Sequence, residues 1–212
     1  MRFKSFYNWP FFSFEEIQSI TKILKSKKIN SLVSRDGQCA KFEKEFSKYI
    51  GNKYSVAMSN GSVALELALK TVGIKKKDQV IVTSRSFVAS ASCVLNIGAI
   101  PVFADIIYET QNIDPNSILK LINKKTKAIV CVHLAGLPCD IFKINTIAKK
   151  NNLKLIEDCS QAHGAQIKNR HVGTFGDIST WSFCTDKIIS TGGEGGIVST
   201  NKYFYFKKLW SL

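Results

Sequence analysis

Short apolar segments alternate with amphipathic segments from Lys53 onward, and this alternation constrains the possible fold more than any other feature of the sequence. Short apolar runs rich in β-branched residues are typical of strands buried on both faces of a sheet. Each interval between these runs has helical spacing and a capping or stop residue. The runs are "YSVAM" (54–58), "QVIVT" (79–83), "IPVFAD" (100–105), "KAIVCVH" (127–133) and "LKLIED" (153–158).

This order of segments predicts an α/β fold. Strands that alternate with helices form βαβ units around a mainly parallel sheet, with helices on both of its faces. Two further strands, around "DISTWSF" and "GGIVST", follow the last of these units and make the sheet mixed. We therefore expect a three-layer αβα architecture.

The chain divides into three regions. Residues 1–52 form a helical segment, in which one helix begins after Ser13 and another ends at Gly51. Residues 53–200 form the large domain. Residues 201–212, "NKYFYFKKLWSL", are amphipathic and rich in aromatic residues, and no later segment covers them. We expect this last region to be the start of a truncated C-terminal part.

The charge of the chain raises the question of nucleic-acid binding. There are 30 Lys and Arg residues against 16 Asp and Glu, a formal net charge of +14. The lysines occur in short runs at expected helix ends and turns, and no motif of a nucleic-acid-binding module is present. A solvated basic surface is therefore favoured over nucleic-acid binding, and it is compatible with an anionic small-molecule substrate.

The remaining composition indicates the reducing environment of the cytoplasm. No apolar run approaches the roughly 18 residues of a membrane span, and the N-terminus lacks the pattern of a secretory signal. Six cysteines are scattered without a paired CxxC spacing, which predicts neither a disulfide framework nor a zinc site.

Residues able to bind a ligand follow the expected strands, and ligands of open α/β sheets bind beyond the carboxyl ends of the strands. Asn60, Gly61 and Ser62 lie between a strand and a helix, where free N–H groups bind phosphate. A simple turn and helix cap explains these three residues equally well. Phe87 begins the next helix, and it either stacks on a flat ring or belongs to the core.

Two charged positions favour a cofactor. Asp158 ends a buried strand and needs a cationic partner, unless it is a helix N-cap. Nearby His163 is more simply explained by a structural hydrogen bond. Lys187 precedes a glycine-rich turn, where partial burial would lower its pKa and free the amine for Schiff-base chemistry. Together, a phosphate-binding turn, a flat residue, a strand-end acid and this lysine fit pyridoxal 5'-phosphate.

At these residues the chain resembles the DegT/DnrJ/EryC1/StrS family of sugar aminotransferases, which are fold-type I pyridoxal-phosphate enzymes. The resemblance runs from about Phe14 to the end of the chain. It includes "SNGSVALELAL", "SFVASASCVLNIGAIPVFADI" and "HLAGLPCDI", and it is most specific in "EDCSQAHGA" and "WSFCTDKIISTGGEGGIVST".

The resemblance assigns a role to each matched position. Gly61 and Ser62 match the phosphate-binding turn of the family, and Ser182 matches a further phosphate contact. Phe87 matches the aromatic residue over the cofactor ring. The other matched residues are Asp158, the partner of the pyridinium nitrogen, Gln161, near the ring hydroxyl, and Lys187, the lysine that forms the Schiff base.

The resemblance also implies a reaction. Some relatives are dehydratases with histidine in place of the lysine, so Lys187 favours transamination. In the family, L-glutamate typically donates the amine, and a keto-sugar on a nucleotide diphosphate accepts it. The product is an amino sugar for a polysaccharide, lipopolysaccharide or glycosylated metabolite, and the enzyme is a homodimer.

Two alternatives stay open. Family members continue further than this chain, into a smaller C-terminal domain and a loop that reaches the partner's active site. The chain is therefore either an aminotransferase or its N-terminal portion, or a truncated pseudoenzyme that holds the cofactor without turnover. Half of a split enzyme would also have this sequence.

Overall fold

The computed structural model describes residues 10–29 and 37–212. The chain forms two compact units, which divide between Phe42 and Glu43. Within the described residues, no helix is of the length and apolar character that crossing a bilayer requires.

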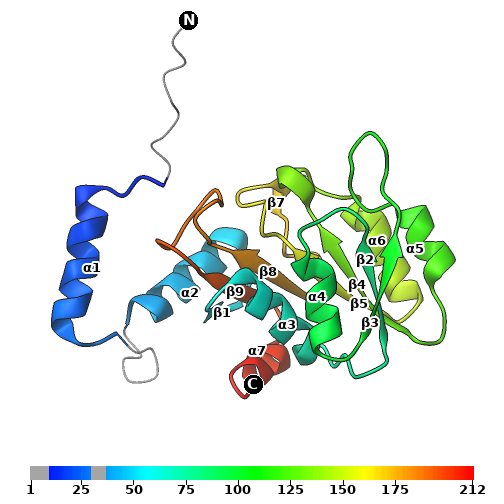
Figure 1. Ribbon diagram of the computed structural model, residues 1–212, viewed down its shortest axis with the longest axis horizontal. Helices are drawn as coiled ribbons and strands as arrows, with labels where there is room; N and C mark the ends of the chain where they lie inside the picture. Colours follow the sequence, from blue (N-terminus) through cyan, green and yellow to red (C-terminus); the bar gives the residue numbers. More distant parts are fainter. Residues whose placement is uncertain (1–9, 30–36) are drawn as a thin grey trace, which may run out of the picture. The chain divides into compact units, whose positions relative to one another are not determined.

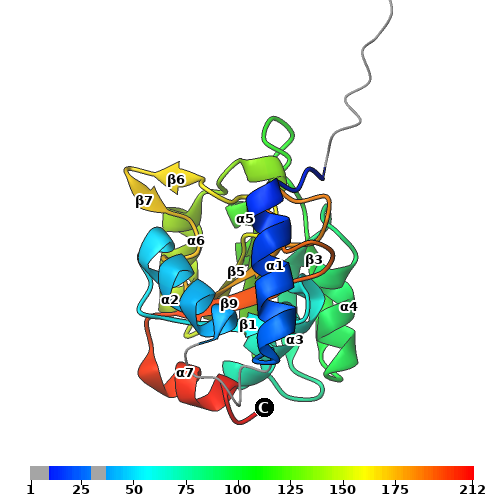
Figure 2. The same cartoon turned by 90° about the vertical axis from the view of Figure 1, so that its left-hand side faces the viewer.

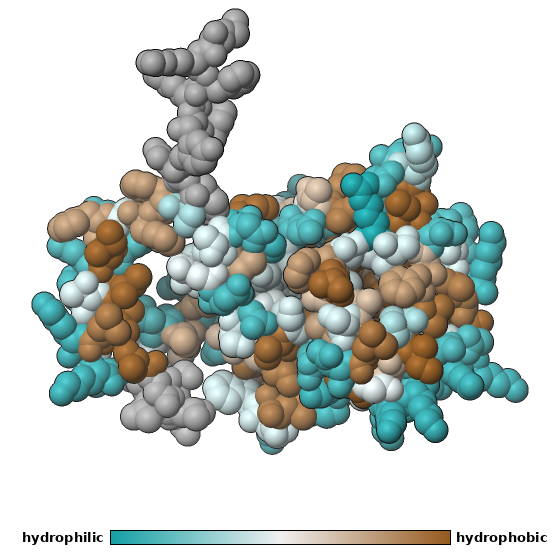
Figure 3. Space-filling model, viewed as in Figure 1, coloured by the Kyte–Doolittle hydropathy of each residue, from teal (hydrophilic) through white to brown (hydrophobic). Residues whose placement is uncertain are grey.

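Helix α1, Phe14–Ser26, belongs to the first unit. Its start is fixed by a capping box, in which the Glu16 amide donates to Ser13 Oγ at 3.2 Å and the Ser13 amide donates to Glu16 Oε2 at 2.6 Å. Its apolar residues follow a helical spacing, and none of its residues is buried. Figure 3 shows apolar side chains along this helix.

A seven-stranded sheet forms the centre of the second unit, in the order β1-β9-β8-β5-β4-β2-β3. Only β9 runs against its neighbours, and the remaining pairings are parallel. The strands are β1 Tyr54–Met58, β2 Gln79–Thr83, β3 Ile100–Ala104, β4 Thr126–Val132, β5 Lys154–Asp158, β8 Ile178–Ser182 and β9 Gly196–Thr200. A separate small hairpin consists of β6 Gln166–Ile167 and β7 Arg170–His171.

Helices cover both faces of this sheet, as Figure 2 shows for α3 and α4 on one side and α6 on the other. The three-layer, mainly parallel architecture expected from the sequence is confirmed, whereas the domain boundaries at residues 52 and 200 stay a prediction. The helices are α2 Gln38–Ile50, α3 Gly61–Thr71, α4 Ala89–Asn96, α5 Pro115–Leu121, α6 Ile141–Lys150 and α7 Tyr203–Leu209, with a 3₁₀ turn at Leu134–Gly136.

The core consists of two layers separated by the sheet. Alternate residues of a strand point to opposite faces, so Ile156 packs under α3 and α4 while its neighbour Leu155 packs under α5 and α6. Phe46 of α2 meets Trp181 of β8 edge-on, with ring centroids 5.2 Å apart. Continuous apolar strands in the sequence therefore reflect burial on both faces.

A fully buried carboxylate ties the end of β5 to the loop before β8. Glu157 accepts hydrogen bonds from the backbone amides of Gly173, Phe175 and Gly176 at 2.6–2.8 Å. It also contacts His133 Nε2 at 3.2 Å. A buried carboxylate is tolerated only with such partners, so this network holds the strand end in place.

Glu157→Gln should destabilise the protein by about 3 kcal/mol, because it removes a buried charge from its partners and turns an amide donor toward backbone donors. Urea unfolding monitored by circular dichroism measures this loss. The matched control is Glu66→Gln, which breaks the part-exposed pair with Lys70 and should cost about 0.5 kcal/mol. Equal losses in the two variants would contradict a structural role for Glu157.

Candidate active site

Strand direction brings the predicted site residues to one edge of the sheet. The carboxyl ends of β1, β2, β4, β5 and β8 share this edge, which a cavity of about 610 Å³ occupies. All seven residues selected from the sequence line it: Gly61, Ser62, Phe87, Asp158, Gln161, Ser182 and Lys187. Their proximity is a finding of the structure, and their roles stay predictions.

The turn between β1 and α3 combines a helix cap with free donors. Asn60 Oδ1 accepts the Val63 amide at 2.9 Å and so caps the helix. Among the described residues, the amides of Gly61 and Ser62 have no acceptor, and they lie where the helix dipole favours an anion. The cap and the anion-binding interpretations are therefore compatible.

Close packing explains the glycine in this turn. A methyl group at Gly61 would lie 2.7 Å from Ser182 Cβ, nearer than side-chain atoms approach one another. Glycine therefore allows the start of α3 to reach the end of β8. This contact brings Ser182 beside the start of α3, and the side chain lines the same cavity as Gly61 and Ser62.

Asp158 is the last residue of β5 and is 8% exposed. Its Oδ1 accepts the Ser160 amide at 3.1 Å and the Ser160 hydroxyl at 2.6 Å. Burial raises the pKa of this carboxyl, while Ser160, His133 and Lys187 oppose the rise. No helix follows Asp158, so the N-cap interpretation is wrong and the residue begins a turn. A cation in the cavity would relieve its burial.

Phe87 precedes β5 in the sequence and Gln161 follows it, and both side chains line the same cavity. Phe87 is 67% exposed, so the interpretation as a core residue is wrong and the ring is accessible to a flat ligand. Gln161 Oε1 accepts the Ala135 amide at 2.7 Å, which orients the side chain.

Lys187 lies in the segment between β8 and β9. This segment folds back on itself through hydrogen bonds from the Thr191 amide to the Phe183 carbonyl at 3.0 Å and from Thr185 Oγ1 to the Gly193 carbonyl at 3.1 Å. Gly192 adopts φ +96°, which favours glycine and allows the turn. The glycines thus hold the lysine at the cavity.

The protonation of Lys187 differs from the sequence-based expectation. Burial lowers the pKa of the amine, but the bond to Asp186 Oδ2 at 2.8 Å and the neighbouring Cys184 outweigh it, so the pKa is raised. The expectation of a lowered pKa is therefore wrong for this arrangement. Asp186 precedes the lysine in "CTDK" but was not selected from the sequence, nor was Glu194, which also lines the cavity.

His163 is buried against aromatic side chains. Its ring packs against Trp181 and Phe183, with centroids 5.4 and 5.3 Å apart. Neither ring nitrogen has a partner among the described residues, so the expected structural hydrogen bond is not found. Burial lowers the pKa of this imidazole to about 4.

His133 and the buried thiols of Cys131 and Cys139 form a cluster. Their ligand atoms lie close enough together to hold a metal ion. His133 Nδ1, however, accepts the Cys139 amide at 3.2 Å, and Nε2 contacts Glu157 at 3.2 Å. Both ring nitrogens therefore already serve the hydrogen-bond network, and we interpret the cluster as structural.

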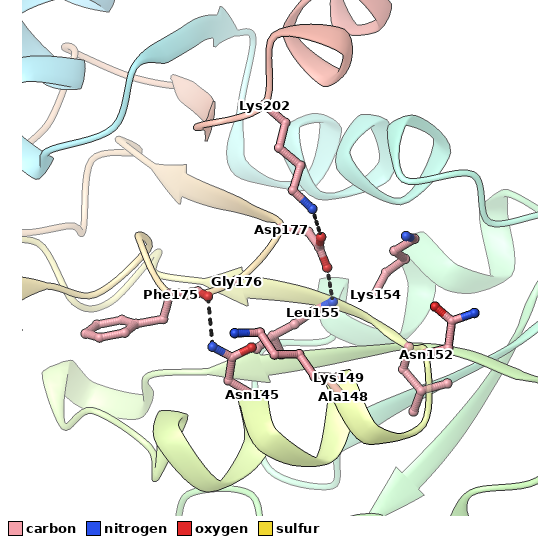
Figure 4. A pocket seen from close by; sticks show the side chains of 11 residues that line it. Asn145, Ala148, Lys149, Asn152, Lys154, Leu155, Phe175, Gly176, Asp177 and Lys202 are labelled. Atoms are coloured by element: carbon pink, nitrogen blue, oxygen red, sulfur yellow. Dashed lines mark hydrogen bonds and ion pairs between the residues drawn. The ribbon is translucent and has the colours of Figure 1, made fainter.

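A second cavity, of about 360 Å³, lies at the opposite edge of the sheet, beside the first residues of β5 (Figure 4). Asp177 accepts the Leu155 amide at 2.9 Å and pairs with Lys202. The carboxylate of Asp177 is thus already paired within the protein. It lies beside the first residues of β5, whereas Asp158 is the last residue of that strand. The candidate active site is the first cavity.

Comparison with known proteins gives a consistent result. The model of the DegT/DnrJ/EryC1/StrS aminotransferase family matches residues 12–210. GDP-perosamine synthase of Escherichia coli O157:H7 is 43% identical over 192 residues, which are 91% of this chain and 52% of that protein. The chain spans about half the length of the curated relatives it matches.

Solved structures share the fold. An aminotransferase from Psychrobacter cryohalolentis has a TM-score of 0.93 and 49% identity, covering 96% of this chain and 51% of its own. A GDP-4-keto-6-deoxymannose-3-dehydratase, solved with a trapped PLP-glutamate geminal diamine, has a TM-score of 0.86 and 30% identity, covering 94% and 52%.

The buried His163 should make stability depend on pH. Its folded pKa of about 4 lies below the ordinary 6.5, so the unfolded chain binds a proton that the folded chain excludes. The stabilisation is complete above about pH 6.5 and falls by about 3 kcal/mol as the pH drops to about 4.

Urea unfolding of His163→Phe across this range tests the effect. The phenyl ring retains the packing against Trp181 and Phe183 and does not titrate. The difference in unfolding free energy between the original chain and the variant should therefore shift by about 3 kcal/mol between pH 7 and about pH 4. A difference that does not change with pH would show that His163 is not buried in its neutral form.

Proposed function

Because the chain belongs to the DegT/DnrJ/EryC1/StrS aminotransferase family, we propose that it binds pyridoxal 5'-phosphate and carries the catalytic lysine of a nucleotide-sugar aminotransferase. The observation that carries this proposal is the meeting of free helix amides, a buried carboxylate and a lysine in one cavity. The amino acceptor would be a keto-sugar on a nucleotide diphosphate, and L-glutamate would donate the amine.

The residues present fit this cofactor. The amides of Gly61 and Ser62, with the Ser182 hydroxyl, would hold the phosphate, because they offer donors at the positive end of α3. Asp158 would hold a protonated ring nitrogen, which supplies the cation that its burial requires. The exposed Phe87 ring would cover one face of the cofactor, and Gln161 would lie near its ring hydroxyl.

Bound pyridoxal phosphate supplies a ring that takes up the electron pair released at the amino-bearing carbon. Asp158 would maintain this capacity by keeping the ring nitrogen protonated. Lys187 Nζ would hold the cofactor and, when free, would move a proton between the carbon that gives up the amine and the carbon that receives it. The folded segment between β8 and β9 would keep this amine at the cavity.

The proposed substrates rest on the relatives. One relative is a GDP-perosamine synthase, another is a dTDP-3-amino-3,6-dideoxy-alpha-D-galactopyranose transaminase, and the dehydratase structure contains glutamate joined to the cofactor. These names support a nucleotide-linked sugar and glutamate for this chain. The product would serve polysaccharide or glycoconjugate synthesis, and the six free thiols suit a cytoplasmic protein.

A cofactor-binding protein without turnover is the second candidate. The chain covers about half of its relatives' length, and the family resemblance implies that a partner subunit contributes to each site. Homodimerisation and complete turnover are therefore proposals for the whole protein. The two candidates differ in whether glutamate can convert the bound cofactor from its aldehyde form to its amine form.

Addition of pyridoxal phosphate to the purified chain should produce a visible absorption band that borohydride fixes covalently to Lys187. Lys187→Ala should abolish this band completely, because among the described residues Lys187 is the lysine that lines the cavity. Lys124→Ala, at an exposed lysine, is the matched control and should retain it. A band that survives in Lys187→Ala would refute the proposal.

Subsequent addition of L-glutamate distinguishes the two candidates. Bleaching of the band, with release of 2-oxoglutarate, would show that the amino-donor half of the reaction occurs. A band that persists with glutamate would favour a binding protein without turnover.

Asp158→Asn should weaken pyridoxal-phosphate binding about 100-fold, or about 3 kcal/mol, because the protonated ring nitrogen loses its buried partner. Equilibrium titration followed by protein fluorescence measures the affinity. Asp140→Asn, at the exposed cap of α6, is the matched control and should bind normally. Equal affinities in the two variants would exclude Asp158 as the partner of the ring.

A further inference from the structure

Three side chains of the segment after β8 form a local network at the mouth of the cavity. Asp186 Oδ2 accepts a hydrogen bond from Lys187 Nζ at 2.8 Å. The other oxygen, Oδ1, accepts the Cys184 thiol at 2.7 Å. The Lys187 side chain is 19% exposed while Asp186 is 73% exposed. The acid therefore meets the amine from the solvent side.

Other ionisable groups also surround the Lys187 amine. Cys184 lies on the same segment as Lys187. Asp158 is the last residue of β5 and His163 lies in the segment after this strand, and both interact electrostatically with Lys187. Glu194 lines the cavity from the far side of the glycine turn. Asp186 alone among these carboxylates forms an ion pair with Lys187 among the described residues.

We propose that Asp186 is a positioning residue that docks the Lys187 amine in its charged form whenever the amine is not attached to the cofactor. This inference rests on the proposed function of Lys187. It adds a residue that neither the predicted site nor the family resemblance assigns. The pair holds Nζ at the cavity entrance, and its solvent exposure allows the amine to leave it.

The Asp186–Lys187 pair controls the rate of cofactor attachment, because it stabilises the protonated form of the Lys187 amine. The ammonium must first release one proton to solvent, because only the neutral amine has a free electron pair. Nζ then forms a bond to the aldehyde carbon, and the aldehyde oxygen leaves as water with the two remaining amine protons. Asp186 stabilises the charged amine, so attachment at neutral pH is slower than it would be without this carboxylate.

The same pair offers the released lysine a defined position. Once the amino donor has displaced Nζ, the free amine returns to Asp186 instead of sampling many rotamers. Asp186 thus accepts a hydrogen bond from the reacting amine, and its role requires no contact with the reacting carbons. Its role is to hold Lys187 and to set the pH at which the amine becomes nucleophilic.

Amine modification in the absence of cofactor tests this role directly. The chain is treated with acetic anhydride over a series of pH values, and peptide mass spectrometry measures modification of Lys187 against the exposed Lys124 as an internal reference. Asp186→Asn should shift the Lys187 midpoint to lower pH by about one unit, which is about tenfold more modification at pH 8. Asp186→Glu should restore most of the original profile.

Glu194→Gln is the matched control, because it removes a carboxylate of the same cavity that does not pair with Lys187. Its profile should coincide with that of the original chain. A Lys187 profile that is unchanged in Asp186→Asn, or equally shifted in Glu194→Gln, would overturn the inference.

The rate of pyridoxal-phosphate attachment, trapped with borohydride, separates this inference from the proposed function. Attachment about tenfold faster in Asp186→Asn at neutral pH supports both. A shifted modification profile without any cofactor attachment in either chain supports the Asp186–Lys187 pair and refutes the proposed function. Attachment at equal rates, with equal modification profiles, supports the proposed function and refutes the role of Asp186.

Discussion

Two consecutive buried carboxylates at the end of β5 are the constraint on which the rest of the site depends. Because alternate strand residues face opposite sides, Glu157 and Asp158 have separate environments. Glu157 is fully buried and satisfied by three backbone amides and His133. Its network fixes the strand end, so that Asp158 can remain at the cavity, where Ser160 is the hydrogen-bond partner of its carboxylate in the described part of the chain.

The cavity combines a buried charge with unpaired hydrogen-bond donors, and one ligand could provide a partner for each of them. Asp158 is buried and requires a cation, and the amides of Gly61 and Ser62 at the start of α3 have no acceptor among the described residues. Lys187 already has a partner, Asp186, which stabilises its charge. A phosphate-bearing, protonated ring with an aldehyde would satisfy the first two groups and compete with Asp186 for the third. This chemical complementarity is what connects the geometry to the proposed aminotransferase.

Much of the fold and most of the candidate site could be predicted from the sequence. Apolar runs identified the strands, because burial on both faces leaves few positions for polar residues. Asp158 and Lys187 were recognisable because a charge beside a buried strand needs an explanation. Asp186 and Glu194 were not selected, since acidic residues in a polar turn are ordinary and their closeness to the amine depends on how that turn folds. The lowered pKa expected for Lys187 was wrong for the same reason.

The sequence by itself determined the layer architecture, the strand segments and the chemical types available at their ends, because these follow from local periodicity and burial. Only the tertiary structure decided which residues meet. It showed that Phe87 is accessible, that the ring nitrogens of His163 have no hydrogen-bond partner within residues 10–29 and 37–212, and that Asp186 pairs with Lys187. Partners and protonation depend on distances between segments far apart in the chain or on the path of a single turn, and no local pattern encodes those distances.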